Sequence, residues 1–190
     1  MQKHLVNLNV GFDNASVIGI GYGYHLKTKM PLVLNLEYSM PLGDRTFDDF
    51  KTKIGGQLNL VRANSFFAAV KVYGIIRRFE NDFARMINFG SEFSTTAGLY
   101  KNKWFAAVEL GFDKAITTHL KHSNLMKQYN PGVQSGWYIP TGGNFSCGLQ
   151  VGYSFKRNDV YAKIGRTLSQ DFKTTSIVPY YAQLGWSMKW

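Results

Sequence analysis

The last eleven residues of the chain, YYAQLGWSMKW at positions 180–190, alternate between apolar side chains and polar or small ones. Successive residues of a β-strand point to opposite faces of a sheet, so residues two apart share a face. The apolar set is Tyr180, Ala182, Leu184, Trp186, Met188 and Trp190, and Gln183, Gly185, Ser187 and Lys189 oppose it. This stretch therefore predicts a strand with one continuous apolar face and one polar face.

The same period-two pattern recurs along nearly the whole chain. It marks nine further segments, at 5–12, 18–26, 32–40, 53–60, 66–73, 87–99, 104–112, 145–155 and 160–165. No segment has a convincing helical periodicity, and no linker, low-complexity tract or charge block divides the sequence. The pattern predicts an all-β protein of ten antiparallel strands in one domain covering residues 1–190. Eight strands is the alternative, if two of the segments only extend hairpins.

The lengths of the connections alternate as well. Those after the second, fourth, sixth and eighth strands are tight, whereas those after the third, fifth, seventh and ninth are longer. The longer ones are centred on residues 43–49, 78–84, 117–143 and 169–177, and the short first connection, Asp13-Asn14, is an exception. Outer-membrane β-barrels have short periplasmic turns at one end and longer external loops at the other. The connections thus favour a transmembrane barrel.

Composition removes several classes of protein. The chain has 190 residues, 22 Lys and Arg against 12 Asp and Glu, a net charge of +10, and one cysteine, Cys147. One cysteine excludes an internal disulfide framework or a Cys-rich zinc module. No apolar run approaches the roughly 18 residues of a membrane helix. The basic residues are dispersed among the strands and no nucleic-acid-binding motif appears, so we expect no nucleic-acid partner.

Aromatic residues on the apolar face gather towards the strand ends. Near the tight turns are Tyr24, Phe66, Trp104, Tyr153, Phe155, Trp186 and Trp190, and near the longer loops are Phe12, Tyr38, Phe112, Phe145 and Tyr180. The strand centres hold mainly Leu, Ile, Val and Ala. Two aromatic girdles around an aliphatic waist match the preference of Trp and Tyr for membrane interfaces. The apolar face is therefore expected to meet lipid.

The opposite face predicts a polar lumen. Its candidate network is Glu37, Lys53, Lys71, Glu92, Glu109, Gln150 and Lys163. Because a ten-stranded barrel barely exceeds the size that side chains can fill, a structural network of paired charges is the favoured interpretation. A narrow channel for small solutes is the alternative. Glycines on this face, such as Gly19, Gly21 and Gly23, suit a crowded, narrow lumen.

The C-terminal strand resembles the assembly signal of bacterial outer-membrane proteins, an alternating apolar strand that ends in an aromatic residue. As architecture, the whole chain is similar to small outer-membrane barrels of the OmpA/OmpX/OmpW general type. The resemblance implies a Gram-negative outer membrane as location, a removed signal peptide, and recognition of the last strand by the outer-membrane assembly machinery. It implies no single function, because such barrels include adhesins, channels, lipid-modifying enzymes, proteases and subunits of complexes.

The longest connection, 117–143, holds the candidate catalytic residues His119, His122 and Ser123. A His that activates a Ser hydroxyl at a bilayer surface would suit lipid hydrolysis. The run is loosely similar to PagL-type lipid A deacylases, but no Asp or Glu occurs between Asp113 and Asp159. Adjacent residues of an extended chain also point to opposite faces. An ordered loop closing the barrel mouth is therefore the favoured interpretation.

The sequence thus favours a non-enzymatic barrel that binds a partner membrane protein or lipopolysaccharide through its external loops, for example as a subunit of a larger outer-membrane complex. Basic residues near the loops suit the phosphates of lipopolysaccharide: Arg45, Arg77, Arg78, Arg85, Lys114, Lys121, Lys127 and Lys173. A narrow channel and a lipid A hydrolase are the alternatives. No metal or cofactor is expected, because His119 and His122 lack a third ligand.

Overall fold

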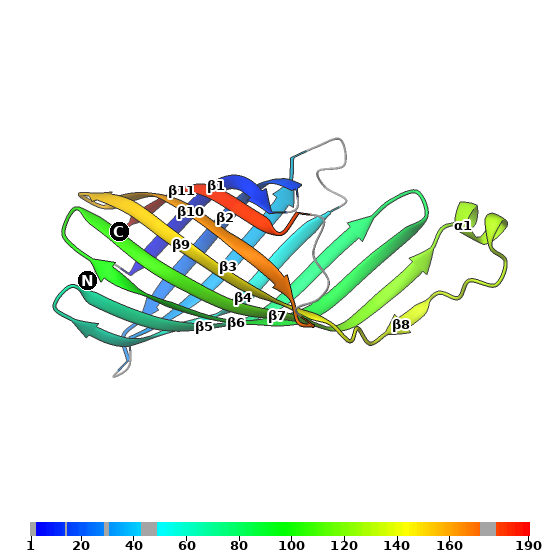
Figure 1. The fold of residues 1–190 in the computed structure, drawn as a ribbon, viewed down its shortest axis with the longest axis horizontal. Coiled ribbons are helices and arrows are strands. Elements are labelled where there is room, and N and C mark those ends of the chain that lie inside the picture. Colours follow the sequence, from blue (N-terminus) through cyan, green and yellow to red (C-terminus); the bar gives the residue numbers. More distant parts are fainter. Residues whose placement is uncertain (1–2, 14, 29–30, 43–48, 172–177) are drawn as a thin grey trace.

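A closed sheet of antiparallel strands makes up most of the molecule (Figure 1). The computed structural model describes residues 3–13, 15–28, 31–42, 49–171 and 178–190. The elements are β1 (His4–Asp13), β2 (Ala15–Leu26), β3 (Leu32–Pro41), β4 (Phe50–Ala63), β5 (Phe66–Glu80), β6 (Ala84–Tyr100), β7 (Trp104–His122), α1 (Asn124–Tyr129), β8 (Gly136–Tyr138), β9 (Gly143–Phe155), β10 (Asn158–Ser169) and β11 (Tyr180–Lys189).

Ten of these strands form a ring. Each pairs with its neighbour in sequence, β7 pairs with β9, and β1 closes the ring by pairing with β11. The closing pair runs from Leu5 opposite Lys189 to Asp13 opposite Tyr181. The predicted ten-stranded antiparallel barrel is confirmed, and the eight-stranded alternative is wrong. The three-residue strand β8 is an addition that pairs only with β7.

The apolar face of the strands points outward. Leu34, Val108 and Leu184, from three different parts of the ring, are 47, 43 and 63% exposed. Their sequence neighbours Val33, Ala107 and Gly185, on the opposite face, are buried. A water-soluble barrel has the reverse arrangement, whereas an exposed aliphatic belt is the surface that a bilayer covers. The chain therefore has the architecture of an outer-membrane β-barrel.

Glycines on the inner face make room for aromatic rings. A Cβ atom on Gly148 or Gly165 would lie 2.1 or 2.3 Å from atoms of Tyr181, and one on Gly185 would lie 2.2 Å from Tyr161. These rings lie across the bare backbone of neighbouring strands, which only glycine allows. Gly21 differs, because a Cβ atom there would meet nothing closer than 3.5 Å. Gly21 therefore has room for a Cβ atom in ordinary van der Waals contact with the Asn7 and Glu37 side chains.

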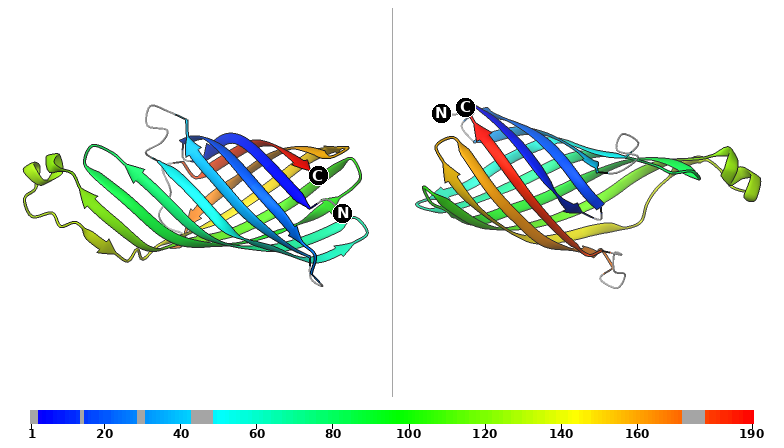
Figure 2. Two further views of the ribbon diagram at one scale, coloured as in Figure 1. Left: turned by 180° about the vertical axis from the view of Figure 1, so that it is seen from behind. Right: turned by 90° about the horizontal axis from the view of Figure 1, so that it is seen from above.

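One wall of the barrel continues beyond the rest, as Figures 1 and 2 show. We call residues 78–88 and 114–139 the arm: the ends of β5, β6 and β7 with α1 and β8. Two expected connections are corrected here. Residues 78–84 are mostly strand, closed by a tight turn in which the Asn81 amide donates to the Ala84 carbonyl at 3.0 Å. The connection expected at 117–143 instead begins after His122, and contains α1 and β8.

The extra strand length of the arm has a physical cause. Backbone pairing between β6 and β7 continues past the apolar belt up to Ala84 opposite His122. Beyond the lipid, a strand no longer needs an apolar outer face, so the hydropathy pattern ends before the hydrogen-bond ladder does. The end of β7, α1 and β8 extend one wall of the barrel and do not fold across its mouth, as the expected ordered loop would (Figures 1 and 2).

The helix content of the described residues is small. α1 has six residues, and none of the described helices is long and apolar enough to span a bilayer. Ser123 caps α1, since its Oγ accepts a hydrogen bond from the Met126 amide at 3.2 Å. Such N-caps stabilise short helices that hydrophobic periodicity alone does not reveal.

Candidate functional site: the polar lumen

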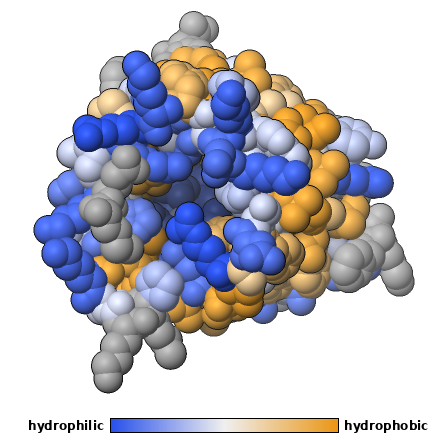
Figure 3. Space-filling view, turned by 90° about the vertical axis from the view of Figure 1, so that its left-hand side faces the viewer, coloured by the Kyte–Doolittle hydropathy of each residue, from blue (hydrophilic) through white to orange (hydrophobic). Residues whose placement is uncertain are grey.

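The inner faces of the ten strands enclose a cavity of about 710 Å³. Its lining begins with Leu5 and Lys189 near the chain ends and reaches Asp49 and Phe79 at the opposite, loop end. Figure 3 looks at the end with the termini and shows a central recess ringed by hydrophilic residues. Because inward residues alternate with outward ones on every strand, this polar lining is the inner counterpart of the lipid-facing belt.

Two of the ion-pair groups inside the lumen join strands that have one other strand between them. Lys53 Nζ on β4 lies 2.7 Å from Glu92 Oε2 on β6. Glu109 on β7 faces two lysines: its Oε2 lies 2.6 Å from Lys163 Nζ, and its Oε1 lies 4.0 Å from Lys71 Nζ. All five side chains are at most 23% exposed. Charges that are largely buried need partners of opposite sign, and the register of the strands supplies them.

Tyrosines extend this network. The Tyr73 hydroxyl donates to Glu37 Oε1 at 2.9 Å, and Asn35 Nδ2 donates to the same hydroxyl at 3.2 Å. Near the turn end, Asn7 Nδ2 donates to the Tyr161 hydroxyl at 2.8 Å and to Ser187 Oγ at 2.9 Å. These bonds satisfy polar groups from strands far apart in the sequence, so they fix the wall from the inside.

The lumen is nearly neutral although the chain is strongly basic. Seven acidic residues line the cavity: Asp13, Glu37, Asp49, Glu92, Glu109, Asp113 and Asp159. Six basic residues line it: Lys51, Lys53, Lys71, Arg77, Lys163 and Lys189. The chain as a whole carries a net charge of +10. The excess positive charge therefore lies outside the lumen, and the interior holds mixed charges of both signs.

All seven residues of the expected lumen network line the cavity. The structure brings five of them into the two ion-pair groups, whereas Glu37 bonds to Tyr73. The network omitted several members, namely Lys51, Tyr73, Asp113, Tyr161 and Tyr181. Parity carried the missing signal for all five, because each lies an even number of residues from another inward residue of its strand, as Lys51 does from Lys53 and Asp113 from Glu109.

The aromatic residues expected at the turn-end interface lie on the outer face. Phe66, Trp104, Tyr153, Phe155 and Trp190 are exposed, and Tyr24 and Trp186 are partly exposed. His4, which is not among them, stacks on Trp190 with 5.7 Å between ring centroids and contacts Tyr24 at 5.3 Å. The rings from the two terminal strands and β2 thus meet where the barrel closes.

The three candidate catalytic residues lie on the arm, at the end of β7 and the start of α1. His119 packs on Trp137 with 4.9 Å between ring centroids, and Ser123 Oγ serves as the helix cap. His122 Nδ1 is buried and has no hydrogen-bond partner among the described residues, so no carboxylate orients this ring there. The structure therefore gives these residues structural contacts, and their catalytic role stays a prediction.

Replacing Ser123 by alanine tests the structural role against the catalytic one. We expect the variant to lose about 1 kcal/mol of local stability at α1, because the Met126 amide loses its acceptor. Hydrogen exchange at that amide should accelerate, which mass spectrometry can measure. The lipid A profile of expressing cells should stay unchanged. A changed profile in Ser123→Ala and His119→Ala cells would establish the hydrolase instead.

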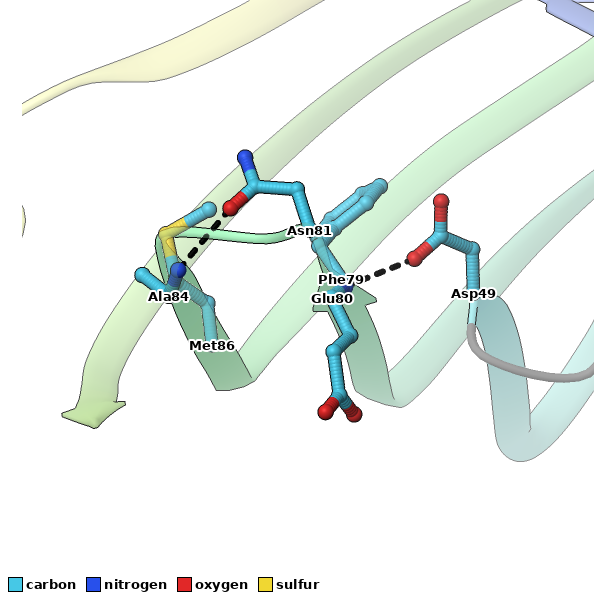
Figure 4. Close-up of a pocket in the computed structure, with 6 residues that line it drawn as sticks. All are labelled: Asp49, Phe79, Glu80, Asn81, Ala84 and Met86. Atoms are coloured by element: carbon cyan, nitrogen blue, oxygen red, sulfur yellow. Dashed lines mark hydrogen bonds between the residues drawn. The ribbon is translucent and has the colours of Figure 1, made fainter. Parts of the chain in front are cut away.

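A smaller cavity of about 230 Å³ lies at the loop end, between β4, β5 and β6 (Figure 4). Its wall is held by two hydrogen bonds to the backbone. The Glu80 amide donates to Asp49 Oδ1 at 2.8 Å, and the Ala84 amide donates to Asn81 Oδ1 at 2.9 Å. These bonds shape the tight turn between β5 and β6, so the cavity belongs to the hairpin tip.

Glu80 joins the two strands of this hairpin through its carboxylate. Arg85 donates from Nε to Glu80 Oε2 at 2.8 Å and from Nη2 to Oε1 at 3.0 Å, and Arg78 bonds to the same carboxylate. These hydrogen bonds, those of Arg85 first, lower the pKa of Glu80 to about 2. A two-pronged guanidinium contact of this kind is the strong form of a surface ion pair.

The hairpin tip should therefore depend on pH only in acid. A lowered carboxyl pKa contributes stability that is complete above pH 4.5 and is lost as the pH falls towards about 2. We expect the Glu80 carboxyl carbon, followed by NMR, to titrate below pH 3, and Glu80→Gln to remove the acid dependence of amide protection at Arg85. A Glu80 midpoint at pH 4 or above would contradict the arrangement.

The basic residues expected to meet lipopolysaccharide divide into three groups. Arg77 points into the lumen and pairs with Asp113, whereas Arg78, Arg85, Lys114, Lys121 and Lys127 lie on the arm. Arg45 and Lys173 lie outside the described residues, as do the centres of two expected loops. In the described part of the chain, no three His, Cys, Asp or Glu residues cluster in a way that could hold a metal ion.

Comparison with known proteins gives similarity of fold alone. No protein-family model and no curated protein matches the chain. Among solved structures, the KdgM porin in complex with disordered oligogalacturonate is similar at a TM-score of 0.49 and 7% identity, over 98% of this chain and 99% of that chain. The β domain of the Bordetella autotransporter BrkA is similar at a TM-score of 0.45 and 11% sequence identity, over 98% of both chains. Omp33 of Acinetobacter baumannii is similar at a TM-score of 0.38 and 9% sequence identity, over 100% of this chain and 98% of that chain.

Proposed function

We propose that the protein is a narrow channel for small hydrophilic solutes. The observation that carries the proposal is the polar cavity of about 710 Å³ whose lining reaches from Lys189 at the turn end to Asp49 at the loop end. Side chains of both signs line it, and water-filled pores select solutes through such linings. A barrel filled only for stability would bring its side chains into contact across the axis and leave no cavity of this size.

Electrical recording tests the proposal. The folded protein, reconstituted in planar bilayers in 1 M KCl, should give discrete single-channel currents. Gly21→Phe should lower the conductance, because Gly21 lines the cavity and a phenyl ring there would take up part of its volume. Gly132→Phe is the matched control, since a Cβ atom on Gly132 meets nothing within 4 Å outside the barrel wall. A folded barrel that carries no current would overturn the proposal.

Binding of a partner through the arm is the second candidate. It is favoured by the exposed apolar residues Tyr129, Trp137 and Ile139, which are 75, 63 and 82% exposed on a segment beyond the belt. Exposed apolar groups that gather on one segment are typical of interaction sites. Gentle extraction of the native membrane, with and without Trp137→Ala and Ile139→Ser, would test it. A partner lost in the variant would support it, and a wild-type protein that purifies alone would argue against it.

Two further expectations remain proposals of the same kind. Recognition of β11 by the outer-membrane assembly machinery rests on its apolar alternation and terminal aromatic residue. Contact with lipopolysaccharide rests on the cations of the arm, of which Lys121 and Lys127 are exposed. Neither needs the lumen, so both are compatible with a channel.

A further inference from the structure

Lys51 holds an unusual place in the lumen. It is the second residue of β4, at the loop end, and it lines the main cavity. Its strand neighbours in register are Ser39 on β3 and Arg77 on β5, and Lys53 follows on the same face. Three cations, Lys51, Lys53 and Arg77, therefore lie on one patch of the inner wall near this entrance.

The other basic residues of the lumen have carboxylate partners. Lys53 pairs with Glu92, Arg77 with Asp113, Lys189 with Asp159, and Lys71 and Lys163 share Glu109. The ammonium group of Lys51 forms no hydrogen bond or ion pair within the described part of the chain. The Ser39 hydroxyl bonds only to the backbone carbonyl of Lys51, at 3.4 Å.

The acidic residues that face this patch are already engaged. Glu92 and Asp113 belong to Lys53 and Arg77, Asp49 accepts from the Glu80 amide, and Asp13 has an interaction of its own. Among the described residues, the ammonium group of Lys51 therefore has no carboxylate within ion-pair distance. In a confined polar cavity, a cation of this kind attracts mobile anions and raises their local concentration.

We infer that Lys51, supported by Lys53 and Arg77, forms an anion-binding subsite at the loop end of the lumen, for the carboxylate or phosphate group of small solutes. The inference rests on the proposed channel and adds its substrate class. Lys51 supplies the direct contact with its three donors, and an ammonium group is an effective point charge for phosphate. Lys53 and Arg77 add positive potential while they keep their carboxylate partners.

Block of the current by inorganic phosphate or citrate tests the subsite. In reconstituted wild-type channels, either anion, added on both sides at constant ionic strength, should reduce the potassium current in a saturable way. Lys51→Gln should raise the half-blocking concentration about tenfold, since a charge-assisted hydrogen bond is lost. Lys51→Arg should keep the block. Lys121→Gln, the same charge change on the arm, should leave it unaltered, and an equal effect of this control would overturn the subsite.

A second measurement needs no current. Acetylation of the lysines in the detergent-solubilised barrel, followed by mass spectrometry, reports how accessible each amine is. Phosphate should slow the acetylation of Lys51 and leave that of Lys121 unchanged. Equal rates with and without phosphate at Lys51 would refute the subsite even in a conducting barrel. Protection of Lys51 in a silent barrel would refute the channel and retain the subsite, so the two failures are distinguishable.

Discussion

Leu184→Arg is expected to lower the free energy of unfolding by about 2–4 kcal/mol, the cost of a charge on the lipid face near the bilayer midplane. Leu184 lies at the middle of β11 and is 63% exposed. In a water-soluble protein, a substitution at so exposed a site is nearly neutral. The large effect follows only if hydrocarbon, and not water, covers this side chain. Urea titration of the barrel folded in lipid vesicles measures the difference.

Ile139→Arg is the matched control for this prediction. Ile139 is still more exposed, at 82%, but it follows β8 on the arm, beyond the apolar belt. We expect its free energy of unfolding to stay within about 0.5 kcal/mol of the wild type. Equal effects of the two arginines would mean that the belt does not face lipid, and the membrane assignment would fail.

Glu109→Gln is expected to change both stability and ion selectivity. Glu109 is the shared partner of Lys71 and Lys163, so its neutralisation leaves two ammonium groups facing the same space. We expect a loss of about 2 kcal/mol, between the values for exposed and fully buried pairs. The reversal potential in a KCl gradient should shift towards anion preference, because the lumen loses one of its seven negative side chains.

The double variant Glu109→Gln/Lys163→Gln separates charge balance from packing. It removes one charge of each sign, and Lys71 remains 4.0 Å from the position of Glu109 Oε1. Most of the lost stability and the original selectivity should return. If the double variant is as unstable as the sum of both single variants, the pair makes no coupled contribution and the proposed role of Glu109 is wrong.

Much of the fold could be predicted because alternate residues of each strand in a membrane barrel face lipid and lumen, and therefore alternate in polarity. The segment 104–112 shows this well, since Val108 and Leu110 are exposed to the outside and Glu109 between them faces Lys163. The strand number and the antiparallel order followed from counting such segments and the connections between them. Lipid and lumen impose opposite demands on neighbouring side chains, so the signal is strong wherever both environments are present.

The alternating pattern did not predict the arm, because the arm lies beyond the apolar belt where lipid and lumen impose opposite demands. Outside the bilayer, both faces of a strand can be polar, as in the stretch from Thr117 to His122, and the alternation that marks a strand disappears. The backbone ladder nevertheless continues, with His119 opposite Ile87. The six-residue helix α1 depends on its Ser123 cap, which is a local contact with little sequence signal.

Whether side chains fill the lumen depends on how they pack, and the alternation of apolar and polar residues does not determine this. Parity indicates which residues point inward, but the space left between them depends on where each side chain lies. Tyr181 illustrates this, since its ring lies across Gly148 and Gly165 and its side chain lines the cavity. The sequence favoured a network that fills the barrel, whereas the ion pairs line a cavity.

Because Gly21 lines the cavity and has room for a Cβ atom, the barrel could also carry an attached chemical group at this position. A cysteine introduced there would have a thiol facing the bore, and its Cβ would lie no closer than 3.5 Å to any neighbour. The native Cys147 is exposed on the outside and could be changed to serine so that only the new thiol reacts. A reagent attached at this single point would then turn the passage into a sensor whose ionic current reports each molecule that the tethered group captures.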